Sequence, residues 1–128
     1  MPKILLVEDD PFIAEIYIKK ISDAGFEVVN ATTGKEALKR IAETPYDLVL
    51  LDMVLPELSG MDILHELRGK TEYDKNLKVV IFSNLSSPEE QEAAAKAGAT
   101  GFISKTDFTP SQVVEEVRRY VDSAPVTQ

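Results

Sequence analysis

Short β-branched runs alternate with longer segments of helical periodicity, and this pattern repeats five times along the chain. Alternation of this kind predicts a parallel sheet with right-handed crossovers and helices on both faces. Five units are too few for an eight-stranded barrel, so the pattern favours an open, three-layer, doubly wound (βα)5 α/β fold. The strands are predicted at Lys3–Val7, Phe26–Asn30, Asp47–Leu51, Lys78–Phe82 and Gly101–Ile103.

The predicted helices carry start and stop signals. Asp10 before Pro11 offers a cap followed by proline at the first helical position. Hydroxyl residues precede the other four helices, three of them with capping-box spacing: Thr33 with Glu36, Ser59, Ser87 with Glu90, and Thr109 with Gln112. Gly25 and Gly98 stand where the first and fourth helices are expected to end.

The helices differ in the apolar surface that they offer to a core. The first presents a stripe of Ile13, Ile16, Tyr17 and Ile21, and the fifth presents Val113, Val114, Val117 and Val121. The fourth, roughly Pro88–Ala97, offers only Ala93, Ala94 and Ala97. Alanine buries little area, so we expect the fourth helix to be weakly held, as elements recruited for switching are.

Composition narrows the classes of function. The 128 residues include 22 acidic and 14 basic side chains, and the formal charge of −8 argues against non-specific binding to nucleic acid. This acidity reflects either solubility or acidic groups clustered to hold a cation. The absence of cysteine excludes disulfides and thiol chemistry. No apolar run approaches the roughly 20 residues that span a membrane, and Met1–Asp10 lacks a signal peptide's features. We therefore expect a cytoplasmic protein.

Polar residues follow four of the five predicted strands. Glu8-Asp9-Asp10 comes after the first, Asp52 after the third, Ser83-Asn84 after the fourth and Ser104-Lys105 after the fifth. Ligands of open α/β sheets bind beyond the carboxyl ends of the strands, so these side chains are expected to converge at one edge.

The chemistry of this set points to a metal and a phosphate. Glu8, Asp9 and Asp52 would repel one another unless a cation were present, and Mg²⁺ prefers such hard oxygen ligands. A carboxylate can itself act as a nucleophile and form an aspartyl phosphate. The Ser83 hydroxyl and the Lys105 ammonium would then neutralise the phosphoryl oxygens.

Each of these residues also has a simpler interpretation. Asp10 is more readily explained as a helix cap than as a ligand. Lys105 could be a solvated surface charge, and Ser83 could cap a turn. Asp52 differs, because it follows a wholly apolar strand, where a bare carboxylate is costly. The joint placement of these residues at strand ends favours a site.

The chain resembles the receiver domain of two-component response regulators. The resemblance is carried by Leu5–Asp10, Leu50–Gly60, Val79–Asn84 and Gly98–Lys105. Asp52, Pro56 and Gly60 keep the family spacing and are the most diagnostic residues. The resemblance covers residues 2 to about 122 and implies a flavodoxin-like sheet of order 2-1-3-4-5. We expect a receiver domain at 1–122 and a flexible tail at 123–128.

The resemblance implies a phosphoacceptor and a metal site. Asp52 matches the acceptor. Asp9 matches a direct Mg²⁺ ligand and Glu8 a ligand acting through water. Asp52 and the backbone carbonyl of Val54 match further metal ligands. The reaction would be self-phosphorylation and self-dephosphorylation, so the chain is not expected to be a conventional enzyme.

The resemblance also implies a switch and a surface that partners read. Lys105 matches the lysine that pairs with the phosphate, Ser83 the switch hydroxyl, and Phe102 the aromatic that changes rotamer on activation. In the family, the fourth helix, fifth strand and fifth helix form the output face. The implied partners are a sensor histidine kinase or phosphotransfer protein and a downstream protein target, with no direct contact to nucleic acid or membrane. The oligomeric state would be a monomer or a phosphorylation-dependent dimer.

Three departures from the family pattern affect the site. Thr106 replaces the usual proline after Lys105, so the loop after the fifth strand could have another shape. Asn84 is larger than the small residue usual after the switch hydroxyl, and it could either narrow access to Asp52 or form a hydrogen bond with a phosphate. Val54 and Leu85 occupy positions that tune attack by water, and neither side chain can orient a water molecule.

Several alternatives to the leading interpretation stay open at this point. The chain stops after the fifth helix, which favours a stand-alone receiver over a receiver cut from a longer regulator or hybrid kinase. A flavin-binding electron carrier of the same fold would need a phosphate loop where Glu8-Asp9-Asp10 stands. An aspartyl-phosphate phosphatase would need a second acidic residue two positions after its nucleophile Asp52, where this chain has Val54. His65 is expected on the surface rather than as a phosphodonor.

Overall fold

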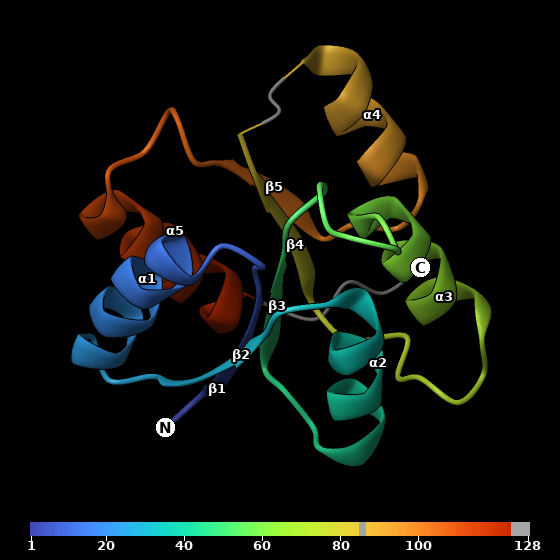
Figure 1. Cartoon of the computed structure of the whole chain (residues 1–128), viewed down its shortest axis with the longest axis horizontal. Coiled ribbons are helices and arrows are strands. Elements are labelled where there is room, and N and C mark those ends of the chain that lie inside the picture. The colour runs from blue at the N-terminus through green and yellow to red at the C-terminus, as the bar shows by residue number, and fades with distance from the viewer. Residues whose placement is uncertain (85–86, 124–128) are drawn as a thin grey trace.

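The computed structural model describes residues 1–84 and 87–123. In this part of the chain five strands alternate with five helices, namely β1 (Lys3–Val7), α1 (Pro11–Asp23), β2 (Glu27–Ala31), α2 (Gly34–Glu43), β3 (Leu48–Leu51), α3 (Gly60–Gly69), β4 (Val79–Ser83), α4 (Pro88–Lys96), β5 (Gly101–Ser104) and α5 (Pro110–Asp122). The strands are parallel and ordered β2-β1-β3-β4-β5. Figure 1 shows α1 and α5 on one face of the sheet and α2, α3 and α4 on the other. The predicted flavodoxin-like, three-layer fold is confirmed.

The strand boundaries differ from the predicted ones by a single residue, except in β1, which is as predicted. The backbone N–H of Phe26 donates to the carbonyl of Ile21 at 3.4 Å, so Phe26 belongs to the turn after α1 and β2 begins one residue later. Ser83 and Ser104 pair in register, which extends β4 and β5 beyond their predicted ends. Both strands therefore reach the edge where the polar residues lie.

The caps explain where the helices begin. Asp10 caps α1 as predicted, because its carboxylate accepts hydrogen bonds from the N–H groups of Phe12 and Ile13. Complete capping boxes open α3, at Ser59 with Asp62, and α5, at Thr109 with Gln112. The other two predicted boxes are only half formed. Thr33 and Ser87 each accept from the third helical N–H, but Glu36 and Glu90 do not return the bond to the capping N–H.

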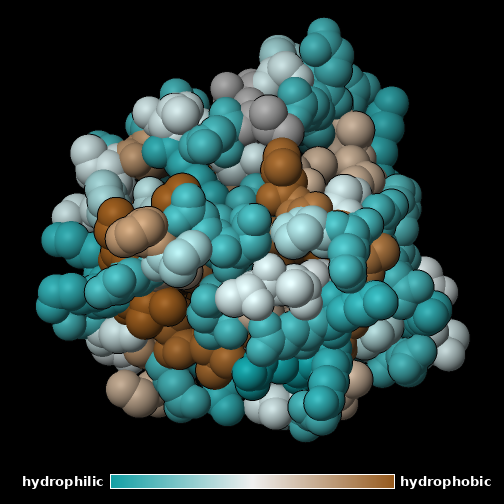
Figure 2. Space-filling view, viewed as in Figure 1, coloured by the Kyte–Doolittle hydropathy of each residue, from teal (hydrophilic) through white to brown (hydrophobic). Residues whose placement is uncertain are grey.

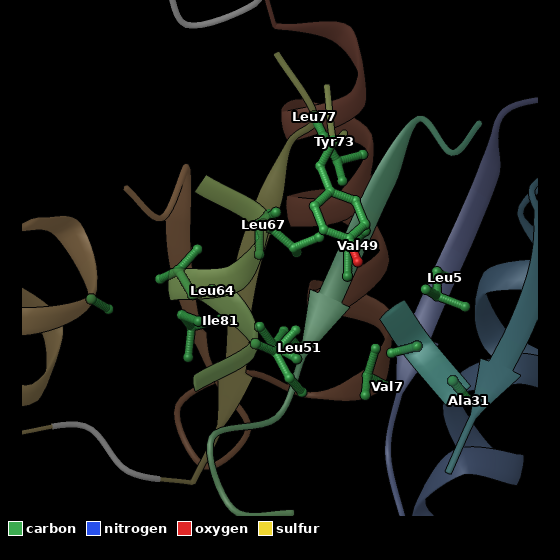
Figure 3. Packing of buried hydrophobic residues seen from close by; sticks show 14 residues of the cluster. Leu5, Val7, Ala31, Val49, Leu51, Leu64, Leu67, Tyr73, Leu77 and Ile81 are labelled. Atoms are coloured by element: carbon green, nitrogen blue, oxygen red, sulfur yellow. The ribbon is translucent and has the colours of Figure 1, made fainter. Parts of the chain in front are cut away.

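Two apolar clusters form the core, one on each face of the sheet. Every residue of β3 and β4 is buried, as predicted for strands covered on both sides. Towards α2, α3 and α4, side chains of Leu64 and Leu67 pack against Val49, Leu51 and Ile81 (Figure 3). The opposite cluster joins the alternate strand residues to α1 and α5. This alternation determines which side of the sheet each site residue faces.

The helices contribute unequally to these clusters. In α5, Val113 and Val117 are buried, whereas α4 buries only Ala94. Two details of the predicted stripes are wrong, because Ala93 is exposed and Ile16 is 51% exposed. Ile16 lies beyond the arc of α1 that contacts the sheet. Figure 2 shows hydrophobic residues gathered over α1 and in a second patch above the middle of the view, with hydrophilic residues over most of the rest.

The longest helices of the described residues, α1 and α5, have 13 residues each. No helix within 1–84 or 87–123 combines the length and apolar character that a membrane crossing requires. The helix α5 ends at Asp122, and the N–H of Ser123 donates to the carbonyl of Tyr120 at 3.3 Å. The rest of the predicted tail, 124–128, lies outside the described residues, so the domain boundary stays a prediction.

Candidate functional site

The polar residues that follow β1, β3 and β5 meet at the carboxyl edge of the sheet. Main-chain hydrogen bonds continue the ladder one residue beyond each strand: the N–H of Glu8 donates to Ala31 at 3.0 Å, that of Asp52 to Val7 at 3.2 Å, and that of Lys105 to Ser83 at 3.0 Å. These bonds fix the backbone from which the side chains project. Figure 1 shows the loops after β3 and β5 on the same, upper side of the molecule.

A buried ion-pair cluster lies at the centre of this edge. The Lys105 ammonium contacts the Glu8 carboxylate and lies 3.3 Å from Asp52 Oδ2. The side chains of Lys105 and Glu8 are 7% and 2% exposed, respectively. Lys105 is therefore not the solvated surface charge that a lone lysine after a short strand usually is. Removing one partner of such a cluster would leave a buried charge uncompensated, which commonly costs about 3–5 kcal/mol.

Three carboxylates come together beside this lysine. Glu8, Asp9 and Asp52 each have an oxygen within 4.8 Å of the other two, and Asp9 is exposed while its neighbours are buried. Burial raises the pKa of the Glu8 carboxyl. Hydrogen bonds from Lys105 and from the Asp10 N–H oppose that rise, and the charge of Asp52 adds to it. A cation at this position would relieve the repulsion between the acidic groups.

Asp52 is held at both carboxylate oxygens. Its Oδ1 accepts a hydrogen bond from the Val54 N–H at 3.1 Å, and its Oδ2 faces Lys105. The loop after β3 folds back so closely that a Cβ on Gly60 would lie 2.3 Å from the Asp52 carbonyl oxygen. The N–H of Gly60 also donates to the Met53 carbonyl at 3.0 Å. The family spacing of aspartate and glycine thus corresponds to a real contact in the structure.

Comparison with known proteins identifies this arrangement. The response regulator receiver domain family matches residues 4–118. The chain belongs to this family. The chemotaxis protein CheY of Thermotoga maritima is 35% identical over 118 residues, which cover 91% of this chain and 95% of that protein. The receiver thus takes its place among CheY-like signalling domains. The flavin-binding alternative receives no support.

Two solved receiver structures are close in fold and sequence. The receiver domain of the Francisella response regulator 1452 has a TM-score of 0.85 and 30% identity, covering 94% of this chain and 97% of that one. The response regulator TrrA of Thermotoga maritima, in complex with Mg²⁺ and BeF, has a TM-score of 0.81 and 30% identity, covering 94% and 99%. The chain spans about half the length of the transcriptional regulatory proteins that it also matches.

The acidic pocket of this receiver fits the metal that the family uses. Receiver domains bind Mg²⁺ at such a pocket, and the donor set here consists of carboxylate oxygens, the hard ligands that this ion prefers. Asp10 is not part of the group, because its side chain caps α1. The simple interpretation of Asp10 as a cap is confirmed.

Ser83 and Phe102 lie on the other face of the sheet from Lys105. Ser83 is 1% exposed and continues the side of β4 that carries Val79 and Ile81. Phe102 pairs in register with Ile81 and packs against the same cluster, half-buried. The two residues predicted to form the switch are therefore diagonal neighbours on adjacent strands. Asn84 is exposed, and Leu85 lies outside the described residues.

The loop after β5 is closed by hydroxyl groups where the family usually has proline. The hydroxyl oxygens of Ser104 and Thr106 lie 3.0 Å apart, and the N–H of Asp107 donates to the Ser104 carbonyl at 3.3 Å. These bonds surround the backbone of Lys105. Thr106 thus takes part in the turn that holds the lysine.

Two aromatic residues beneath Lys105 were not predicted to belong to the site. The Lys105 ammonium lies 5.0 Å from the centre of the Phe82 ring, within the range of a cation–π interaction. The Tyr17 ring packs edge-on against Phe82, with centroids 4.8 Å apart. Burial raises the pKa of the Tyr17 phenol, the charge of Lys105 opposes the rise, and that of Glu8 adds to it. A signal was available, because Phe82 lies on the strand face that carries Glu8, Asp52 and Lys105.

Proposed function

We propose that this receiver accepts a phosphoryl group on Asp52 and that Mg²⁺ is required for the transfer. The observation that carries the proposal is the Asp52 carboxylate, 3.3 Å from a buried ammonium and within 4.8 Å of two further carboxylates. The donor would be a sensor histidine kinase or a phosphotransfer protein, as membership of the family implies. TrrA, with 30% identity, was solved with Mg²⁺ and BeF, which supports the same ligands here.

The transfer breaks a bond between phosphorus and a donor nitrogen and forms one to a carboxylate oxygen of Asp52. The bond from Val54 and the pairing with Lys105 orient the nucleophile before the donor arrives, which lowers the entropic cost of reaction. Lys105 then neutralises a phosphoryl oxygen from the α1 and α5 side, and the Ser83 hydroxyl approaches another from the α3 and α4 side. Bound Mg²⁺ supplies further compensation of the phosphoryl charge.

Burial and existing contacts support different roles for the two acidic residues that follow β1, as the family pattern implies. Glu8 is already bonded by Lys105 and by the Asp10 N–H, whereas Asp9 is exposed. We assign Asp9 and Asp52 as direct ligands, with the backbone carbonyl of Val54 as a third. Glu8 acts through water. The whole domain is assigned to residues 1–122.

The output face comprises α4, β5 and α5. Phosphorylation draws the Ser83 hydroxyl towards the phosphoryl group, and Phe102 turns into the vacated space on the same face of the sheet. The weak packing of α4, with only Ala94 buried, supports its movement in response. A downstream protein reads this change, through a monomer or a phosphorylation-dependent dimer.

Intact-mass measurement after treatment with acetyl phosphate and Mg²⁺ tests the proposal. One phosphoryl mass should appear, should be removed by hydroxylamine, and should be absent in excess chelator. Asp52→Asn should abolish it, while the matched control Asp122→Asn, an exposed residue at the end of α5, should label normally. Full labelling of Asp52→Asn would place the acceptor elsewhere.

A further inference from the structure

A positively charged cleft lies at the opposite edge of the sheet from Asp52. It has a volume of about 380 Å³ and is bordered by the end of α3, the segment leading into β4, and the connection from α4 to β5. Arg68, Lys75, Lys78 and Lys96 line it. Since Lys78 precedes β4 and Gly98–Thr100 precede β5, the cleft lies at the amino ends of these strands. It is therefore separate from the phosphorylation site.

The composition of this cleft contrasts with that of the whole chain. Four of the 14 basic residues line it, and none of the 22 acidic residues does. The chain as a whole carries a charge of −8 and repels anions. Apolar side chains of Leu77, Ala95 and Ala99 complete the lining. An anion approaching the molecule therefore meets a local reversal of charge here.

Three of the four cations of the cleft form no ion pair with a carboxylate of the described residues. Within the described residues, Arg68, Lys75 and Lys78 form no ion pair, whereas eight of the 14 basic side chains do. Lys96 pairs with Glu92 at 3.1 Å, but both of these side chains are largely exposed. The charge of the cleft is thus only partly offset, by Glu92 beside Lys96 and by Asp74 near Arg68.

Main-chain carbonyls orient these cations without cancelling their charge. Arg68 donates from Nε to the Gly98 carbonyl at 2.9 Å and from Nη1 to the Lys75 carbonyl at 3.3 Å, which leaves Nη2 without an acceptor in the described chain. Lys78 donates to the carbonyls of Tyr120 and Val121 at 2.9 Å each and to that of Ser123 at 2.6 Å, so its ammonium is held at the end of α5 and contributes charge rather than a free donor. The Lys75 ammonium donates to the Lys70 carbonyl. Burial lowers the pKa of Arg68, and the charge of Asp74 opposes this. A half-buried guanidinium held in this way is prearranged for an anionic ligand.

We propose that this cleft binds a small molecule bearing a terminal phosphate. The planar guanidinium of Arg68 matches the oxygens of a phosphate. The flexible ammonium groups of Lys75 and Lys96, now on the Lys70 carbonyl and on Glu92, would turn to the phosphate when it binds. The volume lies at the lower end of the roughly 300–1,000 Å³ typical of small-molecule sites, which suits a ligand no larger than a mononucleotide. The phosphate comes either as the free ion or on an organic group.

Titration of the full chain with inorganic phosphate and with AMP, followed by backbone amide NMR, tests this proposal. Chelator and constant ionic strength keep the Asp52 pocket free of metal and remove general salt effects. We expect saturable shifts at Asn76, Gly98, Ala99 and Thr100. Tighter binding of AMP than of phosphate would identify an organic ligand, and equal binding would identify the free ion. Absence of saturable shifts at these amides with both probes would overturn the proposal.

A charge-matched pair of double variants separates a specific site from general attraction. Lys75→Gln with Lys96→Gln removes two cations of the cleft, and we expect the dissociation constant to rise at least about tenfold. Lys20→Gln with Lys39→Gln removes the same charge from two exposed lysines outside it and should leave binding unchanged. Equal weakening in the two variants would refute a specific site. Phosphorylation of Asp52 should be normal in both, so the two proposals fail separately.

Discussion

Gly60 offers a direct test of how tightly the loop that carries Asp52 is built. A Cβ at this position would lie 2.3 Å from the Asp52 carbonyl oxygen and 2.7 Å from Met53 Cα. Contacts of Cβ below 3.0 Å essentially do not occur, so the backbone of the loop would have to retreat by about 0.7 Å. No side-chain rotation can relieve the contact, because both opposing atoms belong to the main chain.

The magnitude follows from two opposing terms. Inserting a methyl group into a packed site costs about 1–3 kcal/mol, and the upper end applies when the neighbours are backbone atoms. Alanine in a helix is favoured over glycine by roughly 0.5–1 kcal/mol. Gly60→Ala should therefore lower the free energy of unfolding by about 2 kcal/mol. It should also slow labelling by acetyl phosphate, because the displaced atoms carry the Asp52 carboxylate.

Gly69 provides the matched control. It ends the same helix, α3, and a Cβ there would meet nothing within 4 Å. Gly69→Ala should gain the helical preference without the clash and raise the free energy of unfolding by about 0.5 kcal/mol. Urea denaturation of both variants measures the difference. If Gly60→Ala proves as stable as Gly69→Ala, the loop that carries Asp52 accommodates a Cβ without cost, and the predicted clash is wrong.

Three further predictions concern the metal, the lifetime of the phosphate and the dependence on pH. Asp9→Asn should weaken Mg²⁺ binding about tenfold more than Glu8→Gln in fluorescence or calorimetric titrations, and equal effects would reverse the assigned ligand shells. Val54 is 63% exposed and its side chain cannot orient water, so Val54→Asn should speed loss of the label severalfold. An unchanged rate would show that another residue controls the lifetime of the phosphate. A hydrogen bond from the Thr32 N–H lowers the pKa of Glu36 below its usual 4.5, so the ionised carboxylate stabilises the folded protein. This stabilisation is complete above that pH and is lost as the pH falls through the lowered pKa. Glu36→Gln should therefore destabilise the protein at pH ~7 more than at pH ~3 in urea titrations, and equal destabilisation at both would exclude this linkage.

The order of elements and the location of the site follow from local patterns in the sequence. Apolar runs and capping residues act over a few positions, so β1 and the starts of the helices could be read directly. Details that depend on tertiary contacts could not. Phe26 has a strand-like side chain, but its N–H is taken by the end of α1. Ile16 continues a helical stripe but lies beyond the arc that touches the sheet, which a period of 3.6 residues cannot resolve.

The site shows the same limit at the level of single residues. The sequence predicted that Lys105 meets the carboxylates, since both follow parallel strands. It did not distinguish a solvated lysine from one buried against Phe82, because that contact depends on the rotamers of residues separated by 23 positions. The alternation of side chains along each strand supplied a usable rule. Because alternate residues of a strand share a face of the sheet, this rule places Phe82 and Lys105 on one face. It places Ser83 and Phe102 on the other.

This division between faces bears on the direction of the proposed signal. On the Lys105 side, Tyr17 and Phe82 support the lysine, and α5 anchors the layer through Val113 and Val117, each worth about 1.5–3 kcal/mol when buried. On the Ser83 side, α4 is anchored by Ala94, whose single methyl contributes about 0.8 kcal/mol. In the proposed mechanism a phosphoryl group on Asp52 would contact both sides. We therefore expect the same pull to displace α4 before it displaces α1 or α5, and a coupling of about 1–3 kcal/mol would be enough to shift its position.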